Sequence, residues 1–215
     1  MIDLRPINTL KKTSTALGIY ASLVGMQHGI FQILRPDVKH SGLLIYAVGP
    51  ACDPELIWHS CFPALTLMPT YLASGISAVL VSLYLLVWVI EFSEANHAAR
   101  LTALFSLLLL PFGGGFVPVY TGLLASFSLA LHNRPRQAST TPSLRTRRFF
   151  CHFWKPTLLL YLAWLPLSWV FGYFFNRLIL SSGPLFFLFF DIFLPALILL
   201  CAHQCDMQAF KHEST

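Results

Sequence analysis

Several runs of apolar residues in this chain are each long enough to cross a lipid bilayer as a helix. The four clear runs cover about residues 13–34, 63–90, 153–175 and 184–203. A helix needs about 20 residues to cross the hydrocarbon core, which is about 30 Å thick. Hydrophobic residues make up 56% of the chain and charged residues 11%, and a soluble fold of this length could not bury so many apolar residues in one core. The runs predict an all-α, polytopic transmembrane helical bundle that forms a single domain over residues 1–215.

A fifth apolar stretch, residues 99–131, is too long for one upright span. As a continuous helix, its 33 residues would measure about 50 Å. Its middle reads Pro111-Phe112-Gly113-Gly114-Gly115-Phe116-Val117-Pro118. Three glycines between two prolines interrupt a helix. The stretch can therefore form one kinked span, or a hairpin of two short helices that either crosses the membrane fully or re-enters it.

The positions of the basic residues favour the hairpin. The basic residues that follow the stretch are Arg134, Arg136, Arg145, Arg147, Arg148 and Lys155, and those that precede the first span are Arg5, Lys11 and Lys12. Cytoplasmic segments of membrane proteins are enriched in Lys and Arg, and only a hairpin places both groups on the same side. Eleven of the 14 basic residues are then cytoplasmic, and the three outside are Arg35, Lys39 and Arg177.

This topology predicts about six helices in the inner (plasma) membrane, with both termini in the cytoplasm and a cytoplasmic basic loop at residues 132–152. The net charge of +5 does not indicate a nucleic-acid partner, because no basic motif or aromatic platform for nucleic acid is present. Lys11 and Lys12 precede an apolar run as in a signal peptide. That run is long, and no small-residue cleavage site follows it, which favours an uncleaved span. The expected partners are the lipid bilayer, a small solute or ion, and a second copy or another membrane protein.

The first span carries a face of small residues. Ala21, Gly25 and Gly29 recur every four residues, a spacing that lets helices pack closely. His28 shares this face, and Gln27 lies beside it. His28 can form an interhelical hydrogen bond that joins two spans, or it can bind a ligand or a proton.

Asp191 lies among phenylalanines in the last span. A carboxylate within a span is unfavourable unless it is paired, hydrated or protonated, so Asp191 is a functional candidate. Pro195 stands four residues later and removes the amide that would bond the carbonyl of Asp191. The alternative is a structural hydrogen bond from a protonated acid.

Two cysteines, Cys52 and Cys61, lie in the predicted external loop between the first two spans. A disulfide can persist there. The weaker alternative is a metal site, for which Asp53, Glu55 and His59 are the further candidates. Free thiols are the third alternative, and no cofactor is indicated.

The other cysteines, Cys151, Cys201 and Cys205, fall at the predicted cytoplasmic, reducing side. Cys201 and Cys205 share a helix face, but His203 points away from it. A metal or redox site within residues 201–205 is therefore disfavoured.

Three features share one predicted depth, about 10 Å below the outer surface. They are His28, Asp191 and the glycine turn, and depth alone does not establish that they are neighbours. Together they define a predicted ligand-binding site, whose residues are Gln27, His28, Gly113, Gly114, Gly115 and Asp191.

Three segments resemble a family of small uncharacterised prokaryotic membrane proteins. They are His28-Gly29-Ile30-Phe31, Gly49-Pro50-x-Cys52 with Trp58-His59-x-Cys61, and Gly113-Gly114-Gly115-Phe116-Val117-Pro118. The resemblance covers roughly residues 17–130. It implies a polytopic membrane protein, and it implies no activity.

Three functions are compatible with these features. The first is a small transporter or channel-like protein with an outward-facing polar cavity. The second is a non-catalytic membrane assembly or sensor subunit in which the polar groups only join helices. The third is a membrane-embedded enzyme that acts on a lipid or quinone, which should show more converging acids, bases or metal ligands. The chain has no phosphate loop, zinc-protease motif or serine nucleophile elbow.

Overall fold

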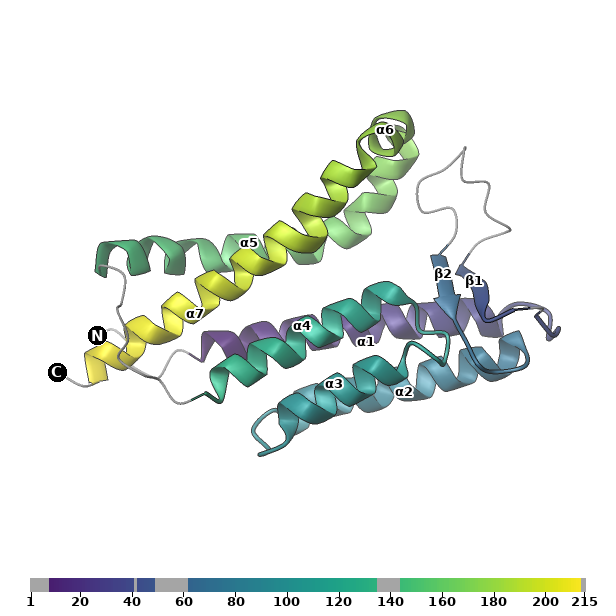
Figure 1. The fold of residues 1–215 in the computed structure, drawn as a ribbon, viewed down its shortest axis with the longest axis horizontal. Helices are drawn as coiled ribbons and strands as arrows, with labels where there is room; N and C mark the ends of the chain where they lie inside the picture. The colour runs from purple at the N-terminus through teal and green to yellow at the C-terminus, as the bar shows by residue number, and fades with distance from the viewer. Residues whose placement is uncertain (1–7, 41, 49–61, 135–143, 214–215) are drawn as a thin grey trace.

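The computed structural model describes residues 8–40, 42–48, 62–134 and 144–213, and it is mostly helical. In chain order the elements are α1 (Thr9–Ile33), β1 (Leu44–Val48), β2 (Phe62–Leu65), α2 (Tyr71–Glu91), α3 (Ala98–Leu108), α4 (Phe116–His132), α5 (Leu144–Phe174), α6 (Asn176–Phe187), a π-helix (Leu188–Phe193) and α7 (Leu194–Glu213). Figure 1 shows both chain termini, the α2–α3 turn and the start of α5 at one end, called here the terminal end. The two strands and the α3–α4 turn lie at the opposite end, called here the sheet end.

Helices α1 to α4 pack closely because the facing residues are small. An added Cβ at Gly29 would lie 2.7 Å from the carbonyl oxygen of Gly75, and one at Gly25 would lie 2.5 Å from the Ser82 hydroxyl oxygen. Ala21, on the same face, is fully buried. The small-residue face predicted for the first span is therefore confirmed as the contact between α1 and α2.

The stretch at residues 99–131 forms a helical hairpin and not one kinked span. α3 and α4 lie side by side and are joined by a turn at the sheet end (Figure 1). Gly113 and Gly115 have positive φ values of 83° and 86°, which residues with a side chain rarely adopt. The break predicted from the glycines and prolines is confirmed.

The structure also contains a short antiparallel sheet, which the all-α prediction did not include. β1 pairs with β2, with Leu44 opposite Leu65 and Ile45 opposite Ala64. The predicted second span therefore begins too early at residue 63. α2 starts at Tyr71, where the Thr70 hydroxyl accepts a hydrogen bond from the amide of Ala73 (3.2 Å).

Helices α5 to α7 form an arm that runs beside α1 and α4 at the terminal end and diverges from them towards α6 (Figure 1). α5 begins at Leu144, so residues 144–152 are helical and the predicted basic loop is wrong for them. Residues 135–143 lie outside the described part of the chain. The last predicted span, residues 184–203, covers the end of α6, the π-helix and half of α7.

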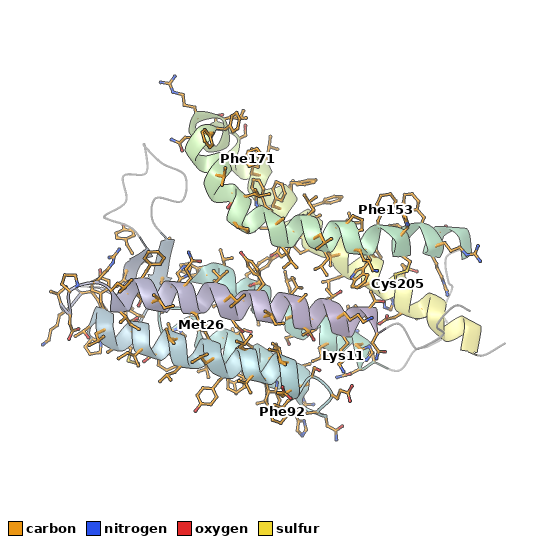
Figure 2. The ribbon with its side chains drawn as sticks, turned by 180° about the vertical axis from the view of Figure 1, so that it is seen from behind. Lys11, Met26, Phe92, Phe153, Phe171 and Cys205 are labelled. Atoms are coloured by element: carbon orange, nitrogen blue, oxygen red, sulfur yellow. A yellow bond between two sulfur atoms is a disulfide. The ribbon has the colours of Figure 1, made fainter. Side chains whose placement is uncertain are left out.

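Two helical stretches, Tyr71–Glu91 and Leu188–Met207, are long and apolar enough to cross a membrane by length and composition. The rest of the chain buries only 33% and 39% of their apolar windows, less than expected of the core helix of a soluble protein. Large apolar side chains such as Leu80, Val87, Leu188 and Ile192 are exposed on these stretches, and Figure 2 shows side chains rich in carbon projecting from the helices. The structure thus indicates association with a membrane.

Candidate functional site

The glycine turn between α3 and α4 closes over His28. The His28 side chain is 3% exposed, and its Nδ1 donates to the carbonyl of Val24 on the preceding turn (2.9 Å). An added Cβ at Gly115 would lie 2.5 Å from Nε2. Glycine is therefore required at this position both for its backbone conformation and for space. The structure thus places His28 in contact with the glycine turn, which their shared predicted depth alone did not establish.

The backbone of the glycine turn has hydrogen-bond partners from three elements. Gln32 on α1 is fully buried and donates from Nε2 to the carbonyl of Gly113 (2.7 Å). The Gly113 amide donates to the carbonyl of Leu65 on β2 (2.9 Å), and the Leu67 amide donates to the carbonyl of Pro111 (2.8 Å). Non-helical backbone is tolerated at membrane depth only where such partners bury it.

Gln32 was missed in the predicted site, although its position carries a signal. It lies four residues after His28 and continues the face of Gly25 and His28 along α1. Gln27, which was predicted, is only half-buried. We name His28, Gln32 and the turn at residues 111–115 the turn cluster, and its contacts lock α3 and α4 against α1.

Asp191 lies in the π-helix and is half-buried. Its backbone carbonyl accepts a hydrogen bond from the Tyr120 hydroxyl on α4. This is the carbonyl predicted to lose its helical partner through Pro195. A π-helical turn widens the helix and is common at functional sites.

A second tyrosine, Tyr161, lies near Asp191, and a third, Tyr20, lies near Tyr161. Tyr161 on α5 is 1% exposed, and its hydroxyl has no hydrogen-bond partner among the described residues. It lies within electrostatic range of Asp191 and of Tyr20 on α1. Asp191, Tyr120, Tyr161 and Tyr20 are named the Asp191 cluster. No tyrosine was in the predicted site, because an aromatic residue in an apolar run gives no sign of its partner.

The predicted site residues therefore divide into two groups on different helix interfaces. His28 faces the turn that starts α4, whereas Asp191 faces Tyr120 and Tyr161 between α4 and α5. The structure brings His28 to the glycines and places Asp191 elsewhere.

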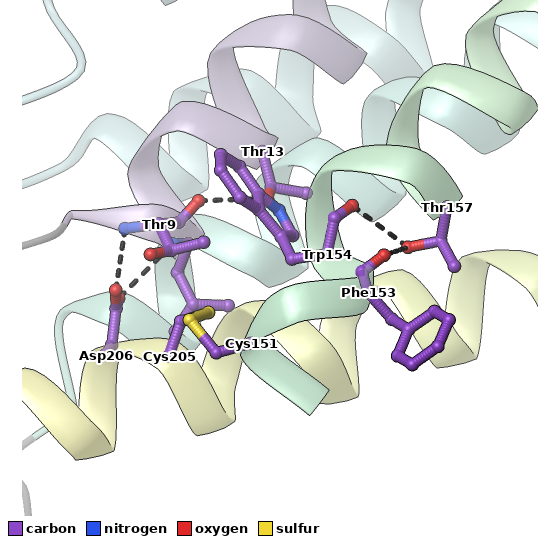
Figure 3. The surroundings of a disulfide bond; sticks show 9 residues. Thr9, Thr13, Cys151, Phe153, Trp154, Thr157, Cys205 and Asp206 are labelled. Carbon is purple, nitrogen blue, oxygen red and sulfur yellow. Dashed lines mark hydrogen bonds between the residues drawn. A yellow bond between two sulfur atoms is a disulfide. The ribbon is translucent and has the colours of Figure 1, made fainter. Parts of the chain in front are cut away.

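A third polar group, at the terminal end, was not predicted. Asp206 on α7 is 1% exposed, and its carboxylate accepts hydrogen bonds from the amides of Thr9 (2.6 Å) and Leu10 (3.2 Å). The cap residue Asn8 makes no side-chain capping bond, so α7 supplies the acceptor for the first turn of α1 (Figure 3). A negative charge at a helix N-terminus is favourable, and this one joins the two ends of the chain.

Two of the three cysteines that were expected at the reducing, cytoplasmic side are paired in the structure. Cys151 on α5 and Cys205 on α7 form a disulfide with a Cα–Cα distance of 4.8 Å (Figure 3), while Cys201 is buried and not bonded to another described cysteine. The predicted position of each cysteine relative to the membrane indicates its redox environment and does not indicate which cysteines are neighbours. The predicted pair Cys52 and Cys61 lies outside the described residues.

The predicted metal candidates Asp53, Glu55 and His59 also lie outside the described residues. Within the described ranges, no group of three or more His, Cys, Asp or Glu side chains is placed to hold a metal ion. The Asp191 cluster offers a carboxyl group and phenolic hydroxyls.

The chain was compared with protein-family models, curated proteins and solved structures, and none of them matches it.

Proposed function

We propose that this chain is a small multi-pass membrane protein of the transporter or channel-like class, with the Asp191 cluster as its ion- or solute-binding site. The carrying observation is the partly exposed carboxyl group of Asp191 within an apolar segment, in electrostatic range of the buried Tyr161 hydroxyl, which has no partner among the described residues. An ionisable group within an apolar segment of a membrane protein is a functional candidate by default. A carboxylate with hydroxyl groups can hold a proton, a sodium ion or a solute with hydrogen-bond donors.

The proposed topology places the terminal end in the cytoplasm. The Cys151–Cys205 pair lies at this end, and because the cytosol is reducing, the proposal predicts that its two thiols are reduced in the cell. The start of α1 with Lys11 and Lys12, and the start of α5 with Arg147 and Arg148, lie at that end. The loop after α1 at the sheet end carries Arg35 and Lys39. An excess of basic residues on the cytoplasmic side supports this orientation.

The lengths of α3 and α4 support a transmembrane bundle in which these two helices form a short hairpin. α3 has 11 residues and α4 has 17, which correspond to lengths of about 16 and 25 Å. Both are shorter than a hydrocarbon core of about 30 Å. The glycine turn therefore lies within the membrane at the sheet end, where Gln32 and β2 satisfy its backbone.

Flux through reconstituted liposomes tests the proposed function. Proton flux is followed with an enclosed pH-sensitive dye under a potassium diffusion potential, and sodium flux with a radioactive tracer. The wild-type chain should conduct one of these ions, and Asp191→Asn should lose that flux while its melting temperature stays close to that of the wild type. The matched control is Asp37→Asn, which makes the same change at an exposed carboxyl group at the sheet end and should keep the flux.

Either of two results would contradict the proposed function. One is a wild-type chain that is folded in the liposomes and conducts neither protons nor sodium ions. The other is an Asp191→Asn chain with the flux of the wild type.

A second candidate function is an assembly or sensor subunit without transport. It is favoured by the exposed aromatic side chains where the arm diverges from the bundle, at Phe171, Phe174 and Phe175, which a membrane partner could cover. In that case Asp191→Asn should leave ion flux at the background of empty liposomes and should change the association of the chain with itself or with a partner.

A further inference from the structure

A groove follows the first three turns of α1 at the terminal end. Its volume is about 420 Å³, and it is lined by Asn8, Lys11, Lys12, Thr15, Ala16 and Ile19. These positions recur at the spacing of one helix face. The groove is separate from the turn cluster and from the Asp191 cluster, and it contains none of their residues.

The chemistry of the groove changes along its length. Lys11, Lys12 and the amide of Asn8 lie at the end nearer the N-terminus, and Ala16 and Ile19 lie deeper along α1. The distance from Lys12 to Ile19 along the helix is about 10 Å. A polar and cationic mouth therefore leads into an apolar channel.

The two lysines differ in their partners. Lys11 forms an ion pair with Glu94 in the α2–α3 turn, and this ammonium group holds the pKa of Glu94 below its ordinary value, first through the hydrogen bond and then through its charge. Figure 2 shows Lys11 at the end of the molecule where Phe92 also lies. Lys12 is exposed, and no ion pair of Lys12 is present within the described ranges. The mouth of the groove thus carries a net positive charge.

We infer that this groove binds an acidic phospholipid of the inner leaflet. The lipid phosphate lies against Lys12 and Asn8, and the first part of one acyl chain follows Ala16 and Ile19. Charge complementarity selects an anionic headgroup, because a basic residue near the surface attracts acidic lipid by about 1 kcal/mol. The apolar depth of the groove favours a lipid over a soluble anion, since acyl carbons gain free energy when they leave water or loose lipid packing.

This inference rests on the membrane placement proposed above, in which the terminal end meets the cytoplasmic surface. It does not rest on transport. A lipid-binding measurement on the full chain therefore separates the two proposals, and Asp191→Asn should bind acidic lipid as the wild type does.

Native mass spectrometry of the purified full chain in detergent, titrated with phosphatidylglycerol or phosphatidylcholine, tests the site. The wild type should retain phosphatidylglycerol in preference to phosphatidylcholine. Lys12→Gln should weaken binding of phosphatidylglycerol by about fivefold, the factor that corresponds to about 1 kcal/mol, and should leave phosphatidylcholine unchanged. The matched control is Lys155→Gln, which removes an exposed charge on α5 outside the groove and should have little effect.

A second variant tests the acyl channel. Thr15→Phe places a ring in the middle of the groove from a half-buried position and should lower the retention of both lipids, with an unchanged melting temperature as evidence of folding. Three results would overturn the inference: equal retention of the two lipids by the wild type, equal effects of Lys12→Gln and Lys155→Gln, or complete displacement of phosphatidylglycerol by inorganic phosphate.

Discussion

The turn cluster and the Asp191 cluster are both polar groups within apolar helices, and they differ in their exposure. In the turn cluster, Gln32 on α1 and the strand β2 provide partners for the backbone of a broken helix, while the buried Oε1 of Gln32 has no partner among the described residues. In the Asp191 cluster, the buried hydroxyl of Tyr161 has no partner among the described residues, and Asp191 keeps partial exposure. A buried group without a partner is unfavourable by about 1–3 kcal/mol. Each cluster has one such atom, so the difference lies in exposure: the buried, hydrogen-bonded backbone of the turn cluster indicates a structural role, and the partial exposure of the Asp191 carboxyl group supports a binding role.

The largest expected effect is that of Gly115→Ala in the turn cluster. The new methyl group would clash with the His28 ring, at 2.5 Å from Nε2, and φ is 86°. Strain and overpacking together should lower the free energy of unfolding by about 3 kcal/mol. Thermal unfolding in detergent measures this effect, with Gly42→Ala as the control, because an added Cβ at Gly42 has no atom within 4 Å. Equal melting temperatures for the two variants would contradict the structural role assigned to the turn cluster.

A smaller loss of stability is expected for Asp206→Ala. Asp206 belongs to the third polar group, at the terminal end, where its carboxylate is hydrogen-bonded. The substitution removes the acceptor of the Thr9 and Leu10 amides. Loss of such a cap should lower the free energy of unfolding by about 2 kcal/mol. Urea unfolding followed by circular dichroism measures the change. Asp37→Ala at an exposed position should change it little, and an equal change in both variants would contradict the capping role.

The smallest stability effects are expected at two tyrosines of the Asp191 cluster, and only one of the two substitutions should lower stability. Tyr120→Phe removes the hydrogen bond to the carbonyl of Asp191 and should lower stability by about 1 kcal/mol. Tyr161→Phe removes a hydroxyl that lacks a described partner, so it should leave stability unchanged or raise it slightly. Differential scanning calorimetry compares the two. A marked loss of stability in Tyr161→Phe would show that its hydroxyl is structural.

Local sequence features predicted the parts of the fold that depend on residues close together in the sequence. The apolar runs indicated helices, the prolines and glycines at residues 111–118 indicated a break in the fifth apolar stretch, and the small residues of the first span indicated close helix packing. The basic residues on either side of that stretch favoured the hairpin over one kinked span. The strand at Phe62–Leu65 was missed because a short apolar run does not distinguish a strand from the start of a helix. The start of α5 was missed because its arginines were assigned to a loop.

The candidate site was predictable only in part. His28 and the glycine turn were expected at one depth, and the structure places them in contact. Asp191 was identified from the unfavourable burial of its charge, and its freed carbonyl from Pro195, but Tyr120 and Tyr161 were not identified as its neighbours. The partners of Asp206 and Cys205 lie far away along the chain, at Thr9 and Cys151, and no local pattern connects such positions.

The most direct test of the comparison is the ion flux and the melting temperature of Asp191→Asn and His28→Gln, measured side by side in liposomes and in detergent. The account predicts that Asp191→Asn keeps its melting temperature and loses proton or sodium flux. It also predicts that His28→Gln melts at a lower temperature and keeps the flux per folded molecule. Loss of flux in a stable His28→Gln chain, together with normal flux in Asp191→Asn, would contradict the account.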